Sequence, residues 1–208
     1  MYYPGVTNIS SFFIAGINYK KTDAAARGQF AINNEQYELL IASAAQFDIH
    51  EFFVLSTCNR TEIYGFAENA GQLSALLCSQ TSGTLETFNE RAYIHSGEKA
   101  IQHLFEVAAG LDSQILGDYE IVGQIKQSAK IAKKGNVIGA YLERMLNDVL
   151  KTSKKIRTNT LLSGGTVSVS FAAVQFIKDK FGEAVTHKKI LLIGVGKIGT
   201  NTCKNIAD

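Results

Sequence analysis

Residues 51–66 read EFFVLSTCNRTEIYGF, with two apolar runs on either side of a short polar stretch. The apolar runs predict two short strands, Glu51–Ser56 and Glu62–Phe66, and the residues TCNR between them are the expected connecting turn. That turn contains Cys58, two residues before Arg60. A lone cysteine is usually a small buried hydrophobe. The arginine beside it makes burial less favourable, so the turn needs another explanation.

Apolar periodicity and breakers predict the elements on both sides of this strand pair. Upstream, we expect a strand over Ser11–Tyr19 and a helix over Asn34–Phe47, capped by Asn33 or Asn34. Downstream, the sequence predicts, in order, helices near Gly71–Ser79 and Thr84–Arg91, a short strand AYIH at 92–95, and helices over Glu98–Ala109, Asp118–Lys134, Gly139–Thr158 and Val167–Phe181. The expected fold class is an α+β domain followed by long helices.

The stretch HKKILLIGVGKIG predicts a strand over Lys189–Ile193 directly before Gly194, Gly196 and Gly199. A GxGxxG turn between a strand and a helix lets backbone amides approach a pyrophosphate, although a glycine turn can also serve packing alone. The residue that selects NAD or NADP is expected about 20 positions further on, and the sequence ends at Asp208. We therefore expect the first βα unit of a truncated Rossmann-like α/β domain.

The composition suits one full domain and part of another, since the chain has 208 residues of which 46% are hydrophobic. Its three cysteines, Cys58, Cys78 and Cys203, form no CxxC pair, and no histidine pair has HxxxH spacing, so neither a disulfide framework nor a metal site is expected. The sequence shows no targeting segment and no run near the roughly 18 apolar residues of a membrane span. We expect a cytoplasmic protein with no membrane partner.

Charge is distributed unevenly along the chain. Between Lys126 and Arg157 there are nine basic residues and two acidic ones, Glu143 and Asp148, which gives a net charge of +7. Since the whole chain carries +2, the remainder carries −5. A basic helical segment on an otherwise acidic protein is typical of a surface for a polyanion such as RNA, and it also occurs as a solvated lysine-rich helix face.

The turn with Cys58 allows two interpretations. A thiol beside Arg60 lies where a cation and exposed backbone amides favour the thiolate, the form that attacks carbonyls. Arg60 can instead hold a substrate carboxylate by a two-pronged hydrogen bond. The residues alone leave open whether Cys58 is a nucleophile or an inert, half-buried cysteine. Cys78, inside LSALLCSQ, is expected in the core, and Cys203 has no partner in the sequence pattern.

One histidine has a distinctive position on its helix. The expected helix over Glu98–Ala109 has an apolar stripe made by Ile101, Leu104, Phe105, Ala108 and Leu111. At about 100° per residue, His103 points roughly 140° away from the centre of that stripe. His103 is therefore predicted either as an ordinary surface histidine or as one that lines a cleft on the other side of the helix.

Four stretches follow one another along the chain: LSTCNRTEIY, HLFEVAAGLDSQILGDYEIVGQIKQS, GGTVSVSFAAV and LLIGVGKIG. In this order they resemble the glutamyl-tRNA reductase family over nearly the whole chain, and the first two are long and specific. One segment departs from the family. An INHKTAP-like stretch is usual after the first strand, whereas this chain has INYKKTDAA at Ile17–Ala25, with Tyr19 in place of the histidine. No catalytic role is assigned to that segment.

The resemblance implies an NADPH-dependent enzyme that reduces glutamyl-tRNA(Glu) to glutamate-1-semialdehyde, the first step of tetrapyrrole and haem synthesis. Cys58 matches the family's nucleophile, which attacks the ester between glutamate and tRNA and forms a thioester. Arg60 matches the residue expected to hold the side-chain carboxylate of glutamate. His103 matches a histidine near the reacting carbonyl, suited to polarising it or to moving protons.

The resemblance implies smaller roles for other residues. Ser113 matches a serine that contacts substrate, and Thr57 and Asn59 would position the turn. Gly194, Gly196 and Gly199 would bind the cofactor. Three further glycines are expected at helix ends and in close packing: Gly110, Gly117 and Gly123.

The family's architecture implies an elongated, V-shaped homodimer with catalytic, NADPH-binding and helical dimerisation domains. Residues 1–160 are then expected to form the catalytic domain and 161–208 the start of the NADPH-binding domain. A chain of this extent is expected to be acylated and to hydrolyse the acyl group without reducing it. The resemblance also implies glutamate-1-semialdehyde aminomutase, the enzyme that uses the product, as a further partner.

Two other functions remain open from the sequence. One is an NAD-dependent dehydrogenase in which Cys58 forms a thioester from a free small aldehyde. The other is a non-catalytic RNA-binding module that uses the basic helices. Acylation of Cys58 by glutamyl-tRNA, but not by free glutamate or an aldehyde, distinguishes a glutamyl-tRNA reductase from both of these alternatives.

Overall fold

A computed structural model describes residues 8–160, 162, 169–194 and 196–207. Its centre is an antiparallel sheet in the order β2-β3-β1-β4. The strands are β1 (Phe12–Asn18), β2 (Phe52–Ser56), β3 (Arg60–Phe66) and β4 (Tyr93–Ser96). The strand pair expected from residues 51–66 is confirmed as β2 and β3.

The turn between β2 and β3 is shorter than predicted. Ser56 is paired with Thr61, and Arg60 already belongs to β3, opposite Asn18 of β1. Because successive side chains of a strand point to opposite faces, Arg60 lies on the same face of the sheet as Glu62. Its side chain therefore points away from the turn. This register carries the guanidinium into the interior.

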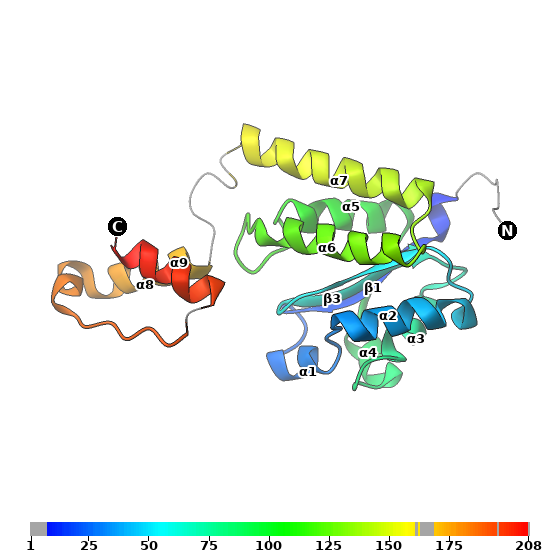
Figure 1. Ribbon diagram of the computed structural model, residues 1–208, viewed down its shortest axis with the longest axis horizontal. Helices are drawn as coiled ribbons and strands as arrows, with labels where there is room; N and C mark the ends of the chain where they lie inside the picture. The colour runs from blue at the N-terminus through cyan, green and yellow to red at the C-terminus, as the bar shows by residue number, and fades with distance from the viewer. Residues whose placement is uncertain (1–7, 161, 163–168, 195, 208) are drawn as a thin grey trace.

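Helices cover both faces of the sheet (Figure 1). One face carries α2 (Asn34–Ser43), α3 (Ala70–Cys78) and α4 (Leu85–Arg91), and the other carries α5 (Gly97–Ala108) and α6 (Glu120–Lys134), with α7 (Ala140–Asn159) outside them. These helices confirm the predictions to within about two residues, except that the predicted helix over Asn34–Phe47 finishes as the 3-10 helix η2 (Ala44–Phe47). Asn33 is the cap.

Two short elements near the N-terminus were not predicted. They are η1 (Ile9–Ser11) and α1 (Ala24–Gly28). Helix α1 begins after Asp23, whose side chain accepts a hydrogen bond from the Ala26 amide at 2.7 Å. Five residues are too few to show helical periodicity, so only the cap marks this helix in the sequence.

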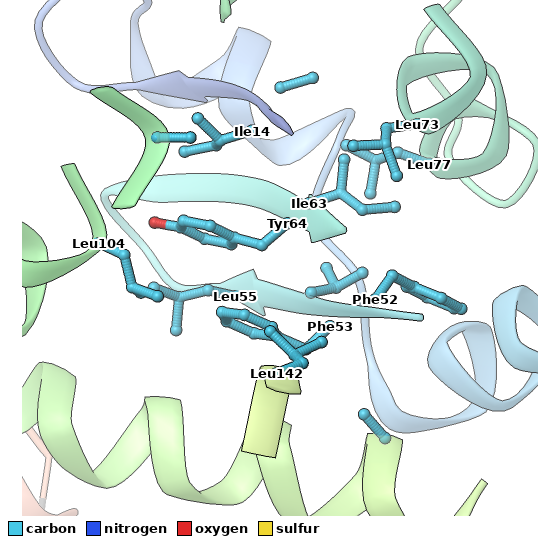
Figure 2. Close-up of a cluster of buried hydrophobic side chains, with 14 of the residues drawn as sticks. Ile14, Phe52, Phe53, Leu55, Ile63, Tyr64, Leu73, Leu77, Leu104 and Leu142 are labelled. Carbon is cyan, nitrogen blue, oxygen red and sulfur yellow. The ribbon is translucent and has the colours of Figure 1, made fainter. Parts of the chain in front are cut away.

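The core lies on both faces of the central strands, which explains why their sequences are apolar runs and not alternating patterns. Phe52, Phe53 and Tyr64 are fully buried. Figure 2 shows Phe53 and Tyr64 on the neighbouring strands β2 and β3, where their rings stack with centroids 4.6 Å apart. Burial of each such side chain stabilises the fold by about 1.5–3 kcal/mol.

The free edge of β2 is tied to two helices. The Val54 amide donates a hydrogen bond to the Tyr37 hydroxyl of α2 at 2.7 Å, and the Val54 carbonyl accepts one from Ser128 of α6. The Phe52 amide donates to the Val137 carbonyl at 2.9 Å. Burial raises the pKa of Tyr37 to about 12, so this hydroxyl keeps its proton. These contacts fix α2 and α6 against the outer strand.

The C-terminal part contains α8 (Val169–Phe181), η4 (Gly182–His187) and α9 (Lys197–Ala207), and α8 packs against α9. The strand expected over Lys189–Ile193 is not formed, and Leu191 and Ile193 are 84% and 89% exposed. A strand needs a hydrogen-bonded neighbour, and no other strand of the described chain lies beside this segment. The Rossmann-like unit is therefore not confirmed, although a helix, α9, begins at Lys197 after Gly194 and Gly196, as predicted. Val167 and Ser168 of the expected helix lie outside the described residues.

No helix in the described ranges is long and apolar enough to cross a membrane.

Candidate active site

The turn that holds Cys58 is closed by the threonine before it. The Thr57 hydroxyl oxygen accepts hydrogen bonds from the Asn59 and Arg60 amides, both at 3.1 Å, and the Thr57 amide donates to the Arg60 carbonyl at 2.8 Å. Cys58 at the tip is exposed. Thr57 therefore shapes the turn, and the thiol is accessible from solvent.

The segment after β1 packs against this turn. The Tyr19 amide donates to the Asn59 carbonyl at 2.9 Å, and Arg27 of α1 donates from Nε to the Cys58 carbonyl at 3.1 Å. Arg27 also donates from Nη1 to the Thr22 carbonyl. No sequence pattern pointed to Arg27, because it lies 31 positions from Cys58 and just beyond the segment Ile17–Ala25.

Arg60 lies inside the protein and is 2% exposed. Its Nη1 donates to Glu62 Oε1 at 2.8 Å and to Asp112 Oδ2 at 3.1 Å, and its Nη2 donates to the Asp112 carbonyl. Burial disfavours the charged guanidinium, but the Glu62 carboxylate, together with Tyr93, Tyr64 and Asp112, outweighs burial, so the pKa of Arg60 lies above its ordinary value. The cation expected beside the thiol is instead paired within the interior.

Glu62 is the centre of the buried polar cluster. Besides Arg60, its carboxylate accepts from the Tyr64 hydroxyl at 2.6 Å, from the Tyr93 hydroxyl and from His103 Nε2. Burial acts to raise the pKa of Glu62, but the Arg60 charge and the His103 hydrogen bond outweigh it and lower that pKa to about 2. Glu62 is therefore an ionised, fully buried carboxylate.

His103 is 8% exposed and lies 2.9 Å from Glu62 through Nε2. Because an ionised carboxylate only accepts hydrogen bonds, Nε2 carries the proton and Nδ1 is the nitrogen that can gain or lose one. His95 packs beside it at 5.2 Å between ring centroids, and burial, together with the neighbouring His103, lowers the pKa of His95. His103 thus belongs to an interior cluster, so it is neither an ordinary surface histidine nor a residue on the far side of the helix from the buried face.

The predicted apolar stripe of α5 was partly wrong. The helix buries Ala100, His103, Leu104 and Val107, whereas Leu111 is 49% exposed. The prediction counted apolar side chains alone and so rotated the buried face away from the histidine. Leu111 also lies beyond the helix, after Gly110 turns the chain with φ of +74°.

The loop after α5 brings a second carboxylate to Arg60. Gly110 and Gly117 have φ of +74° and +80°, and the Gly117 amide donates to the Gly110 carbonyl at 2.9 Å, which closes the loop. Asp112 on this loop is buried and also forms an ion pair with Lys20. Ser113 is half-buried on the same loop. The predicted role of Gly110 at a helix end is confirmed, whereas a Cβ at Gly123 would meet no described atom within 4 Å.

The site therefore combines an exposed cysteine in the β2–β3 turn with a set of paired charges that begins at Arg60 in β3. Buried Arg60 and exposed Lys20 are matched by the buried anions Glu62 and Asp112. Glu62 and Asp112 lie inside the stretches STCNRTE and GLDS, which were singled out in the sequence. The contact between Arg60 and Asp112 could not be predicted, because the two residues are 52 positions apart in the sequence.

The other predicted cysteine and glycine positions lie elsewhere. Cys78 at the end of α3 is half-buried, and burial raises the pKa of its thiol to about 11, which fits the core role expected for it. Cys203 on α9 is exposed. In the glycine turn, Gly194 has φ of +111°, and a Cβ at Gly199 would lie 2.1 Å from the Gly194 carbonyl oxygen.

Comparison with known proteins finds one family. The family described as "Glutamyl-tRNAGlu reductase, N-terminal domain" matches residues 15–160. The glutamyl-tRNA reductase of Christiangramia forsetii is 48% identical over 195 residues, covering 94% of this chain and 46% of that protein. That of Aquifex aeolicus is 35% identical over 194 residues, covering 92% and 47%. This chain thus spans about half the length of the curated relatives it matches.

A solved structure has the same fold. The glutamyl-tRNA reductase from Methanopyrus kandleri superimposes with a TM-score of 0.69 at 24% sequence identity, covering 95% of this chain and 47% of that one.

Proposed function

The chain belongs to the glutamyl-tRNA reductase family, and from this we propose that it acts in the NADPH-dependent reduction of glutamyl-tRNA(Glu) to glutamate-1-semialdehyde, the first step of tetrapyrrole synthesis. The observation that carries the proposal is the position of Cys58. Its thiol is exposed at the tip of a rigid turn, directly before the buried Arg60 and Glu62 of the same strand. A reactive thiol needs this access and a fixed approach to its substrate.

In the proposed first step, the Cys58 thiolate attacks the carbonyl carbon of the glutamyl ester. A carbon–sulfur bond forms, the bond to the ribose oxygen breaks, and that oxygen takes a proton as the tRNA leaves. His103 is proposed to supply or relay this proton through Nδ1, because Glu62 holds Nε2 in the protonated state. The product is a thioester on Cys58.

Arg60 is proposed to hold the side-chain carboxylate of the glutamyl group. The interior contacts use both Nη1 hydrogens and one on Nη2. Among the described residues, Nε and the second Nη2 hydrogen have no hydrogen bond, so these donors are available to a carboxylate. Ser113 is proposed to contact substrate, and Thr57 and Asn59 to position the turn.

NADPH is the proposed cofactor, with its pyrophosphate at Gly194, Gly196 and Gly199. The close approach between Gly194 and Gly199 and the start of α9 at Lys197, just after Gly196, fit a phosphate-binding turn. When bound, NADPH would supply the hydride that converts the thioester to the aldehyde and frees the Cys58 thiolate. Residues 1–160 would then form the catalytic domain and 161–208 part of the cofactor domain.

Labelled glutamyl-tRNA tests the proposal directly. Incubation with the chain should place labelled glutamate on the protein in a linkage that hydroxylamine cleaves, as it does a thioester. Cys58→Ser should take up no stable label, because a serine alkoxide is much harder to form at neutral pH than a thiolate. Cys78→Ser is the matched control and should be labelled like the parent. Equal labelling of both variants would show that Cys58 is structural, and labelling by a free aldehyde would favour a different dehydrogenase.

A further inference from the structure

A groove of about 660 Å³ between α6 and α7 is lined by four exposed cationic side chains and one aromatic ring. The basic groove, as we call it, contains Lys126 of α6, the three α7 residues Lys151, Lys154 and Arg157, and Tyr119 at the start of α6. The Arg157 guanidinium lies over the Tyr119 ring at 4.4 Å from its centroid. No acidic residue lines this groove.

The charges of the basic groove are not neutralised within the part of the chain that the structure describes. There, no ion pair joins any of its four cations to a carboxylate, whereas Lys133, further along α6, is paired with Glu143. A solvated helix face with interspersed signs would show such pairs throughout. The concentration of unpaired positive charge in one hollow instead favours an anionic ligand.

The spacing of these cations fits a polymer. Lys151 and Arg157 are six residues apart, which corresponds to about 9 Å along the axis of α7. One strand of a nucleic-acid duplex advances about 3.4 Å per phosphate, so this row spans about three phosphates. Lys126 on the facing helix adds a cation across the groove. A single small anion would use only part of this row.

The basic groove is linked to the candidate active site by the loop between α5 and α6. Tyr119, at the end of that loop, lies in the groove, and Asp112, near its beginning, binds Arg60. The Ser153 hydroxyl of α7 donates to the Ala108 carbonyl and lies 3.3 Å from the Tyr119 hydroxyl, which fixes α7 against the same loop. In Figure 1 the C-terminal end of α7 and the helix α1 lie toward the same side of the part that contains the sheet, with α7 above the sheet and α1 below it.

We propose that the basic groove binds the sugar-phosphate backbone of the RNA whose aminoacylated end reaches Cys58. The inference rests on the proposed function, since it takes the RNA to be the glutamyl-tRNA substrate. The groove fixes the position of the RNA and carries no sequence information, because its contacts are to phosphates. The four cations are positioning residues and take no part in bond making.

The test compares two variants of equal charge. Lys151→Gln/Lys154→Gln removes two cations from the groove, and Lys130→Gln/Lys134→Gln removes two exposed cations one turn apart near the other end of α6. The dissociation constant for uncharged tRNA(Glu) is measured between 50 and 200 mM KCl. The groove variant should bind at least about tenfold more weakly, with a salt slope smaller by about 1.4–1.8, while the control stays near the parent. Thermal unfolding confirms that both variants are folded.

Three outcomes overturn the proposal. Equal weakening in both variants would mean that only the net charge matters. An unchanged salt slope in the groove variant would mean that the RNA binds elsewhere. Groove-dependent binding to vesicles of phosphatidylcholine and phosphatidylglycerol (3:1), without binding to tRNA, would identify a membrane surface instead.

Acylation of Cys58 separates this proposal from the proposed function. If tRNA binds in a groove-dependent way but no glutamyl group reaches Cys58, the RNA surface stands and the chemistry fails. If the groove variant is acylated at the parental rate in 200 mM KCl with subsaturating glutamyl-tRNA, the chemistry stands and the groove is not the RNA site.

Discussion

Cys58 and Glu62 are four residues apart in the sequence, yet the first is exposed and the second is fully buried. The turn around Cys58 is held by backbone hydrogen bonds and by Thr57, so the thiol itself makes no contact on which folding depends. Glu62 has four side-chain partners from three elements. The difference separates two tasks: the proposed nucleophile remains accessible, and the buried groups that follow it in β3 are held by one another.

Removing the centre of the buried cluster should have the largest effect. Glu62→Gln leaves Arg60 buried with less opposing charge and removes an ionised acceptor from Tyr64, Tyr93 and His103. Breaking a buried ion pair on one side costs about 3–5 kcal/mol, so the free energy of unfolding in urea should fall by about that amount. Glu38→Gln, at an exposed position on α2, is the control and should change it by less than about 0.5 kcal/mol. Similar losses in both variants would mean that the cluster does not stabilise the fold.

Lowering the pH should also reduce the stability that the ionised Glu62 provides, without any substitution. The pKa of Glu62 is about 2 in the folded protein, against an ordinary value of 4.5, so the unfolded chain binds the proton first as the pH falls. The stabilisation is complete above pH 4.5 and is lost progressively between pH 4.5 and 2, by about 3 kcal/mol in total. Urea unfolding of the parent and of Glu62→Gln across this range should give curves that converge at low pH. Parallel curves would contradict the low pKa.

A smaller loss of stability is expected on substitution of Arg60, which lies between the turn with Cys58 and the buried cluster around Glu62. Arg60→Lys keeps the charge but loses the planar fork and its bonds to Asp112, so unfolding should become easier by about 1–3 kcal/mol. Single-turnover acylation by glutamyl-tRNA should slow at least about tenfold, measured in buffer where the variant is fully folded. Arg91→Lys, on the exposed end of α4, is the control. Acylation at the parental rate in Arg60→Lys would remove Arg60 from the substrate site.

The smallest effect on stability is expected at the nucleophile. Cys58→Ser changes one exposed atom, so the free energy of unfolding should stay within about 0.5 kcal/mol of the parent, even though acylation is lost. Urea unfolding of the same preparation that is used for labelling provides the measurement. A loss of more than about 1 kcal/mol would show that the thiol is packed in solution and that the contrast with Glu62 is weaker than described.

Local sequence patterns predicted the helices and strands whose residues alone carry the signal for them. The strand pair at residues 51–66 and the helices α5 to α7 follow from runs and periodicities that lie within single segments. The segment Lys189–Ile193 shows the limit, because a strand also needs a neighbour and none is present in the described residues.

The candidate site was predicted only in part, for the same reason. The exposed turn with Cys58 could be read locally, whereas the inward direction of Arg60 depends on Glu62, His103 and Asp112 together. His103 was placed off the buried face because hydrophobic periodicity assigns no burial to a histidine. Its burial becomes favourable once an ionised carboxylate accepts its Nε2 hydrogen.

The hydroxyl groups of Tyr37 and Ser128 protect the edge of β2 against aggregation at high protein concentration. The outer strand β2 has the sequence FFVLS, a short apolar segment of high β-propensity that could recruit the same strand from another molecule. Tyr37 and Ser128 already occupy the outward amide and carbonyl of Val54, and Val137 occupies the amide of Phe52. Three of the outward backbone groups of this edge are therefore already occupied by the protein's own helices and loop, which opposes pairing with another molecule.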